Sequence, residues 1–246
     1  DVEYGRRFLV KLWNVSSFAS KLLKDYAPDK KAECELQPLD KWILSRAARL
    51  TRTVTEAMEK CQFNIAVEEI RNFTWHTFCD CYVEAVKDRL YRPELHSEVK
   101  KAAAQHALYK VLYRILQLLA PITPHLTEEI FQTMYSEHKG YRSLQLSPWP
   151  EFEQALVDEQ AEKRGDLIMA LITEVRREKA EKRMPLNAQM KKLTVYAGNK
   201  AMADVIREGE GDIAGTLKVD RFVVRAEEGN GREIAQFANV RFISEY

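Results

Sequence analysis

Residues 71–91 (RNFTWHTFCDCYVEAVKDRLY) constrain the fold more than any other segment, because they predict one helix with two unlike faces. Aromatic side chains crowd the segment, while the polar residues follow at steps of four, four and three: His76, Asp80, Glu84 and Lys87. Such spacing places the four polar groups along a single stripe of an α-helix. We therefore expect a central helix that packs its rings into a core and turns a polar stripe away from it.

The segments on either side of this helix are also helical in pattern. Apolar residues recur along them at helical spacing, and prolines separate them: Pro93 ends the central helix, Pro121 ends the next one and Pro124 opens the last. The predicted helices cover residues 2–25, 39–60, 63–91, 98–119 and a short stretch from 124. Five helices joined by short loops, with a proline-rich strap at residues 143–150, predict an antiparallel bundle. We assign it to a first domain, residues 1–152.

The composition changes after residue 152, and a second domain is predicted at residues 153–246. It opens with a long charged helix at residues 153–184, and glycines at positions 209, 211, 215, 229 and 231 are expected to mark turns. The remaining elements are a short helix at 202–207 and strands at 192–197, 222–225 and 240–244. The predicted fold class is mainly α: an antiparallel helix bundle, then a long helix and a small α/β appendix, of which residues 198–246 have no assigned role.

Composition bounds the class of protein. Hydrophobic residues make up 46% of the 246 positions and charged residues 30%, which is typical of a soluble globular chain. No apolar run reaches the roughly 18 residues of a membrane span. The net charge of +1 argues against a polycation that binds nucleic acid non-specifically. The cysteines lack metal-site spacing and indicate reduced thiols in the cytoplasm: Cys34, Cys61, Cys79 and Cys81. Because the chain opens with Asp1 inside a predicted helix, we expect it to be a piece of a longer protein.

Neither a metal site nor a catalytic centre is predicted. His76 and Cys79 share a helix face, but Cys81 lies roughly 200° further round, so the three cannot ligate one ion. His76 and Asp80 stand four residues apart, as an oriented general base requires. No nucleophile stands in a glycine-rich elbow and no glycine-rich phosphate loop occurs, so we prefer a structural His–Asp pair.

A cationic stripe runs along the first predicted helix. Its members are spaced four, three and four residues apart and so share one face: Arg7, Lys11, Asn14 and Phe18. Basic groups suit phosphates, an amide suits a base edge and an aromatic ring suits stacking, so the stripe is compatible with unpaired RNA. A solvated cationic face beside the core explains the same spacing without RNA.

A second basic segment lies at residues 163–192, with nine basic residues against four acidic ones. Its densest part, VRREKAEKRMPLNAQMKK, ends a helix in a proline-stopped turn that can lie along a phosphate backbone. A solvated helix whose charges interact with one another at i, i+4 explains the pattern equally well.

Four stretches of the sequence, taken in order, resemble a known family. They are DVEYGRRFLVKLWNVSSF, FTWHTFCDCYVEAVKDRLY, LAPITPHLTEEIF and SLQLSPWPE. Together they are similar to the anticodon-binding region of class I aminoacyl-tRNA synthetases of the valyl, isoleucyl and leucyl subgroup. FCDCYVEAVKDRLY and the basic VRREKAEKRMPLNAQMKKL are most similar to valyl-tRNA synthetases, and the appendix more weakly resembles their archaeal members.

The resemblance implies a function without an active site. Such enzymes join an amino acid to its tRNA with ATP and Mg²⁺, and the valyl ones edit misacylated threonine in a separate domain. The HIGH and KMSKS motifs of adenylate formation do not occur here. The resemblance therefore implies a tRNA-reading C-terminal part with no catalytic residue and no cofactor of its own. Its partners would be the anticodon stem-loop of valine tRNA and the catalytic and editing domains of the same protein.

The resemblance also assigns roles to residues. In this family the first and third helices form the anticodon cradle, which favours RNA contact at the matching positions and along the basic C-terminal helix. The expected RNA-binding residues are Arg7, Lys11, Asn14, Phe18, Arg71, Lys87, Arg89, Arg176, Lys182 and Arg183. Trp13 is expected to anchor the bundle core. Two alternatives stay open: the equivalent region of an isoleucyl enzyme, and a helical scaffold that binds another protein.

Overall fold

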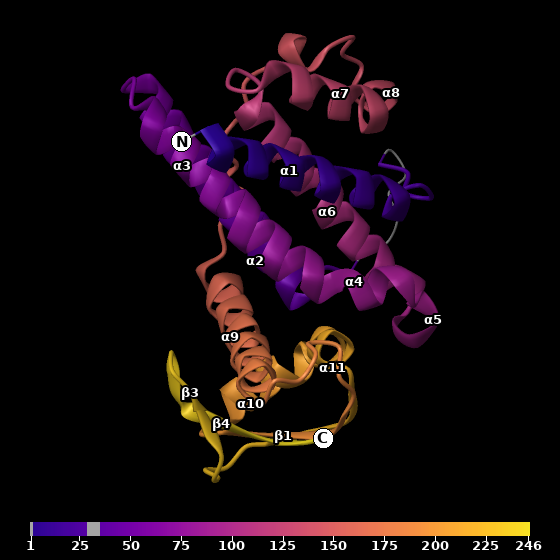
Figure 1. The fold of residues 1–246 in the computed structure, drawn as a ribbon, viewed down its shortest axis with the longest axis vertical. Coiled ribbons are helices and arrows are strands. Elements are labelled where there is room, and N and C mark those ends of the chain that lie inside the picture. Colours follow the sequence, from indigo (N-terminus) through magenta and orange to yellow (C-terminus); the bar gives the residue numbers. More distant parts are fainter. Residues whose placement is uncertain (1, 29–34) are drawn as a thin grey trace.

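The protein consists of a helix bundle joined by one long helix to a small sheet (Figure 1). The computed structural model describes residues 2–28 and 35–246, so Cys34 lies outside the described residues. The bundle helices are α1 Val2–Leu22, α2 Pro38–Glu59, α3 Phe63–Asn72, α4 Glu84–Tyr91, α5 Pro93–His96, α6 Glu98–Leu119, α7 Pro124–Met134 and α8 Ser136–Lys139. The mainly α fold class is confirmed. Within the described part of the chain, no helix is both long and apolar enough to cross a membrane.

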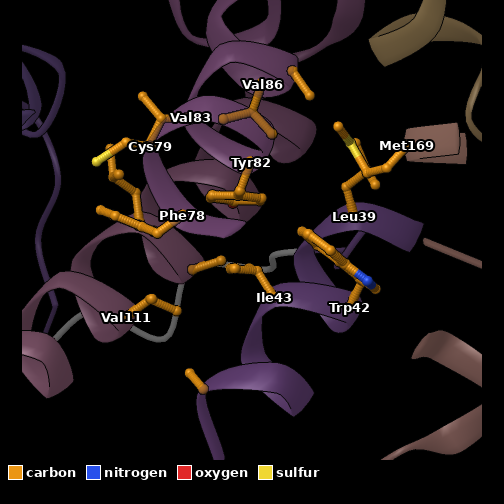
Figure 2. Packing of buried hydrophobic residues seen from close by; sticks show 14 of the residues in the cluster. Leu39, Trp42, Ile43, Phe78, Cys79, Tyr82, Val83, Val86, Val111 and Met169 are labelled. Carbon is orange, nitrogen blue, oxygen red and sulfur yellow. The ribbon is translucent and has the colours of Figure 1, made fainter. Parts of the chain in front are cut away.

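The predicted central helix is continuous through α3 and α4, but its middle is a π-helix, η1 Phe73–Val83. Hydrogen bonds in a π-helix span five residues, and such stretches occur frequently at functional sites. Phe78 and Tyr82 of η1 are fully buried, and their rings stack 6.3 Å apart. Figure 2 shows these rings beside Ile43 of α2 and Val111 of α6. The aromatic face therefore builds the core, as predicted.

The long helix α9 Glu159–Glu181 packs against α2 and ties the second part of the chain to the bundle. Gly165 permits the close approach, because a Cβ there would lie 2.2 Å from the Trp42 ring. The Trp42 indole N–H donates to Asp166 (2.8 Å), which also accepts from Arg46 (2.7 Å). A glycine notch and a shared carboxylate thus fix α9 on α2.

The α/β appendix contains a four-stranded sheet in the order β2-β1-β4-β3. Its strands are β1 Met190–Ala197, β2 Val219–Arg225, β3 Arg232–Ile234 and β4 Phe237–Glu245. β1 pairs in parallel with β2 and antiparallel with β4. A parallel pair needs a crossover, and two short helices supply it: α10 Lys200–Glu208 and α11 Glu210–Leu217. Figure 1 shows α10 and α11 beside the lower end of α9.

Two predictions in the second part are wrong. The glycines at 211 and 215 lie inside α11 rather than in turns. Gly215 lies so close to Asp88 of α4 that an added Cβ would approach its side chain to 2.5 Å, so this glycine serves helix packing. The long helix begins six residues later than expected, because Asp158 caps it by accepting from two backbone N–H groups. The division into residues 1–152 and 153–246 stays a prediction.

A buried ion-pair network joins α4 to α2 and α11. The Arg89 guanidinium donates to both oxygens of Asp40 (2.9 Å each) and to Asp212 (2.6 Å). The Tyr82 hydroxyl donates to Asp40 as well (2.8 Å). Burial raises the pKa of Asp212 to about 6. Burial opposes the charge of Arg89, but Asp212 and Asp40 outweigh it and raise the Arg89 pKa. The α/β appendix therefore docks on the bundle through desolvated, paired charges.

Candidate nucleic-acid interface

A groove runs between α1 and the η1–α4 segment. We call it the α1 groove; its volume is about 430 Å³. It is lined by Arg7, Val10, Lys11, Asn14, Val15, Phe18, Trp75, Cys79, Asp80, Val83, Glu84 and Lys87. The whole predicted stripe of α1 and one predicted residue of α4 therefore meet in one hollow, although 69 residues separate Lys11 from Asp80 in the sequence.

The polar stripe of the central helix supplies the carboxylates of the α1 groove. Lys11 Nζ donates to Asp80 Oδ1 (2.6 Å), and His76 Nδ1 lies 3.4 Å from the other Asp80 oxygen. Lys87 pairs with Glu84 in the same way. Because each ammonium already has a carboxylate partner, the groove offers both donors and acceptors. Such chemistry suits base edges better than it suits phosphates alone.

Aromatic rings form the apolar walls of the groove. Lys11 Nζ lies 4.8 Å from the Trp75 ring centroid, and Lys87 Nζ lies 5.1 Å from that of Phe18. Tyr91 packs edge-on against Phe18 at 5.9 Å. Both wall rings are only partly buried. Partly exposed aromatic rings are the surfaces on which unpaired bases stack, and stacking of this kind contributes roughly 1–3 kcal/mol per base.

Arg71 lies beyond one end of the groove rather than inside it. Its guanidinium carbon lies 4.5 Å from the centroid of the Tyr4 ring, and Tyr4 stacks on Trp75 at 6.5 Å. The cation thus extends the aromatic row that begins at the groove wall.

The three predicted RNA-binding residues near the C-terminal end of α9 lie in two different places: Arg176 in one, and Lys182 and Arg183 in the other. Arg176 lines a second hollow that shares Asp80, Glu84 and Lys87 with the α1 groove. Lys182 pairs with Glu178 (2.7 Å) and lies over the Tyr246 ring, and Arg183 follows it with a left-handed φ of 54°. This end of α9 lies outside both hollows.

Two of the predicted roles are wrong. Arg89 is 1% exposed and holds the buried network, so it cannot contact RNA at the surface. Trp13 is 44% exposed and does not anchor the core, which Leu12 enters instead. In both cases a neighbouring position on the same helix faces the other way, since successive residues turn by about 100°.

Burial disfavours the charged thiolate form of two cysteines on the central helix. Burial raises the pKa of Cys79 to about 12 and also raises that of Cys81, whereas a reactive or metal-binding cysteine needs the thiolate. Among residues 2–28 and 35–246, no group of three or more His, Cys, Asp or Glu side chains is arranged to hold a metal ion.

Residues 40–195 match the family model described as the anticodon-binding domain of tRNA ligase. The chain belongs to this family. The valine–tRNA ligase of Pyrococcus furiosus is 41% identical over 227 residues, which are 92% of this chain and 25% of that protein. The enzyme of Methanothermobacter thermautotrophicus is 43% identical over 219 residues, 89% of this chain and 24% of that protein. For Methanocaldococcus jannaschii the identity is 34% over 226 residues, 91% and 25% respectively.

This anticodon-binding domain spans about a quarter of the length of the curated relatives it matches. The predicted resemblance to the anticodon-binding region of valyl-tRNA synthetases is confirmed. The lining residues that the sequence prediction did not include among the RNA-binding positions include Trp75, Asn187 and Lys218. Trp75 was hidden among core aromatics, and the other two lie in loops that only the tertiary fold brings to α4.

Proposed function

We propose that this chain is the anticodon-reading part of a valine–tRNA ligase and that the α1 groove receives an unpaired anticodon base. One observation carries the proposal: two helices bring cations, an amide, carboxylates and two partly exposed rings to a single hollow. Sequence-specific RNA recognition targets loops whose bases splay out, stack on aromatic rings and form hydrogen bonds at their edges. The family membership and the names of the relatives support the same assignment.

The proposed recognition assigns a separate task to each group. Phe18 and Trp75 stack on the faces of a base. Asn14 has no hydrogen-bond partner within the described residues, so its amide is available to a base edge that offers a donor and an acceptor. Asp80 accepts from N–H groups and therefore favours bases with an exocyclic amino group. Arg7, at the exposed end, serves the backbone phosphates.

The remaining parts of the proposed enzyme lie outside this chain. The parent would attach valine to its tRNA at the expense of ATP in the cytoplasm, with Mg²⁺ and ATP held by its catalytic domain and misacylated tRNA cleared by its editing domain. The chain itself would then need no cofactor, and its binding partner would be the anticodon arm of the valine isoacceptors.

The anticodon dependence of binding tests the proposal. Fluorescence anisotropy with the 246-residue chain should give a dissociation constant for the valine tRNA anticodon stem-loop at least tenfold below that for the same stem-loop with a changed anticodon. We expect this because the bases, rather than the phosphates, differ between the two RNAs. Equal affinity for both stem-loops would refute base reading by the groove.

A matched pair of α1 variants separates RNA binding from a scaffold role. Arg6 and Arg7 both pair with Glu3 at 3.1 Å, but only Arg7 lines the groove. Arg7→Ala should weaken stem-loop binding several-fold, and Arg6→Ala should change it much less. A protein-binding scaffold would leave both variants with the same, unchanged affinity for RNA.

A further inference from the structure

A second hollow of about 420 Å³ adjoins the α1 groove on the other side of the polar stripe. Asp80, Glu84 and Lys87 line both hollows, so the stripe forms a ridge between them. The far wall comes from α9, the turn before β1 and the end of α11. We call this space the junction hollow, because the bundle and the α/β appendix meet across it.

The carboxylates of the junction hollow are already neutralised by partners. Asp80 pairs with Lys11 and Glu84 with Lys87. Asp88 accepts from Arg92, from His96 (2.9 Å) and from Lys218 (3.1 Å). Each negative charge in the junction hollow is therefore matched by a cation.

Arg176 is the cation that lacks such a match. It is half-buried in the wall of the hollow and forms no hydrogen bond or ion pair with any residue that the structure describes. Its neighbour Arg177, which faces elsewhere, pairs with Glu174 (3.6 Å) and Glu181 (3.3 Å). A planar guanidinium with unused donors is suited to bidentate binding of a phosphate. The Arg176 guanidinium is therefore available to bind an anion in the hollow.

A buried lysine fixes the geometry of the two loops that complete the junction hollow. Lys179 is 0% exposed and donates to the backbone carbonyls of Leu186 (3.2 Å), Ala188 (2.7 Å) and Leu217 (2.7 Å). The first two carbonyls flank Asn187, and the third immediately precedes Lys218. One ammonium group therefore holds both loops in place around the hollow.

The electrostatics of this corner agree with that geometry. Burial lowers the pKa of Lys179, and the positive charges of Arg176 and Lys218 lower it further. Lys179 therefore lies close enough to Arg176 and to Lys218 to be repelled by each of them, and an anion in the hollow would relieve that repulsion.

We propose that the junction hollow binds an RNA phosphodiester, with Arg176 as its principal ligand and Asn187 as a second donor. The inference rests on the proposed anticodon reading, because the hollow adjoins the groove assigned to a base and shares three lining residues with it. The phosphate is that of a nucleotide adjacent to the base in the α1 groove, on the other side of the Asp80–Glu84–Lys87 ridge. The α/β appendix is then part of the RNA interface, since its turn and its α11 end build the site.

The test compares Arg176→Ala with the matched control Arg177→Ala in the 246-residue chain. Both variants remove one positive charge from the same turn of α9, but only the first alters the junction hollow. Binding of the valine anticodon stem-loop is measured by anisotropy across a series of salt concentrations. Arg176→Ala should weaken binding about 5- to 30-fold, by a similar factor for stem-loops of different anticodon. The slope of the logarithm of the binding constant against the logarithm of the salt concentration should also become shallower by about one, because one phosphate contact is lost.

Phosphate-ethylation interference supplies a second readout on the same RNA. Ethylation of one phosphate beside the anticodon should weaken binding of the parent chain and of Arg177→Ala at least as much as Arg176→Ala does, and should weaken binding of Arg176→Ala itself much less, because its main contact with that phosphate is already lost. Equal affinities and salt slopes for the two variants, with anticodon-dependent binding intact, would overturn this inference alone. A parent chain that binds the stem-loop without regard to its anticodon would remove the proposed function and this inference together.

Discussion

Lys87 and Arg89 stand two residues apart on α4, yet their surroundings are opposite. The Lys87 side chain is 36% exposed, lines the α1 groove and pairs with Glu84. The Arg89 side chain is 2% exposed and lies between Asp40 and Asp212. Two residues turn an α-helix by roughly 200°, so one cation of the pair faces solvent and the other faces the joint between the bundle and the α/β appendix.

The contrast separates two uses of a positive charge. A partly exposed ion pair can exchange its carboxylate for a ligand at small cost, because water still solvates both groups. A buried pair cannot, because removal of one partner leaves the other charge desolvated. The groove side of α4 is therefore suited to binding, and the joint side to fixing the position of the appendix that completes the junction hollow.

Arg89→Met tests the buried half of this comparison and should have the largest effect. The substitution leaves Asp40 and Asp212 buried without their cation, and breaking such a pair costs roughly 3–5 kcal/mol. Urea unfolding at pH 7 should show a loss of that size in the free energy of unfolding. The charge-conserving variant Arg89→Lys should recover only part of the lost free energy of unfolding, because an ammonium cannot bridge two carboxylates as a planar guanidinium does.

A loss below about 1 kcal/mol for Arg89→Met would contradict this account. It would mean that the carboxylates find other partners or protons, and that the network does not hold the appendix in place.

Asp88, between the two cations in the sequence, allows a test by pH. Burial alone would raise its pKa, but hydrogen bonds from Arg92, His96 and Lys218 outweigh burial and lower it to about 2 from 3.8. The folded state therefore holds this carboxylate charged at pH values where the unfolded chain protonates it. That stability is present above pH 3.8 and is lost as the pH falls from 3.8 to about 2.

The expected loss attributable to Asp88 is about 2 kcal/mol. Free energies of unfolding measured between pH 5 and pH 2 should therefore fall more steeply for the parent chain than for Asp88→Asn, which cannot titrate there. Parallel curves for the two proteins would show that Asp88 contributes nothing to the pH dependence of the free energy of unfolding. That result would weaken the distinction between the joint side and the groove side of α4.

Much of the fold follows from local pattern. Helical spacing and the prolines at 93, 121 and 124 predicted the bundle helices within a few residues. The π-helical geometry of η1 was not predicted, because the spacing of side chains along a helix does not specify which carbonyl each N–H group bonds to. The helix at α11 was missed because its glycines resemble turn residues, whereas Gly215 is required by contact with α4.

The site was predictable to the extent that helical spacing decides which side chains share a face. The α1 stripe and Lys87 meet as that spacing suggested. Arg89 shows the limit of the argument, because the sequence around it does not reveal that it is buried. The carboxylate that covers it, Asp212 of α11, stands 123 residues away. The junction hollow shows the same limit, because Asn187 and Lys218 reach it only through the folded appendix.

Lys87→Met, the counterpart of the Arg89 variant, should have the smallest effect on stability. The substitution removes a partly exposed ion pair with Glu84 and a cation–π contact with Phe18, which together contribute about 1 kcal/mol or less to the free energy of unfolding. Its affinity for the anticodon stem-loop should nevertheless fall several-fold, because Lys87 borders both hollows. The same urea titration and the same anisotropy assay measure the two effects.

If Lys87→Met destabilised the fold as much as Arg89→Met, or bound the stem-loop as well as the parent chain, the two faces of α4 would not differ in role. A stable variant with weakened binding would instead locate the RNA-facing side of α4 at Lys87, with Arg89 needed only to hold the structure behind it.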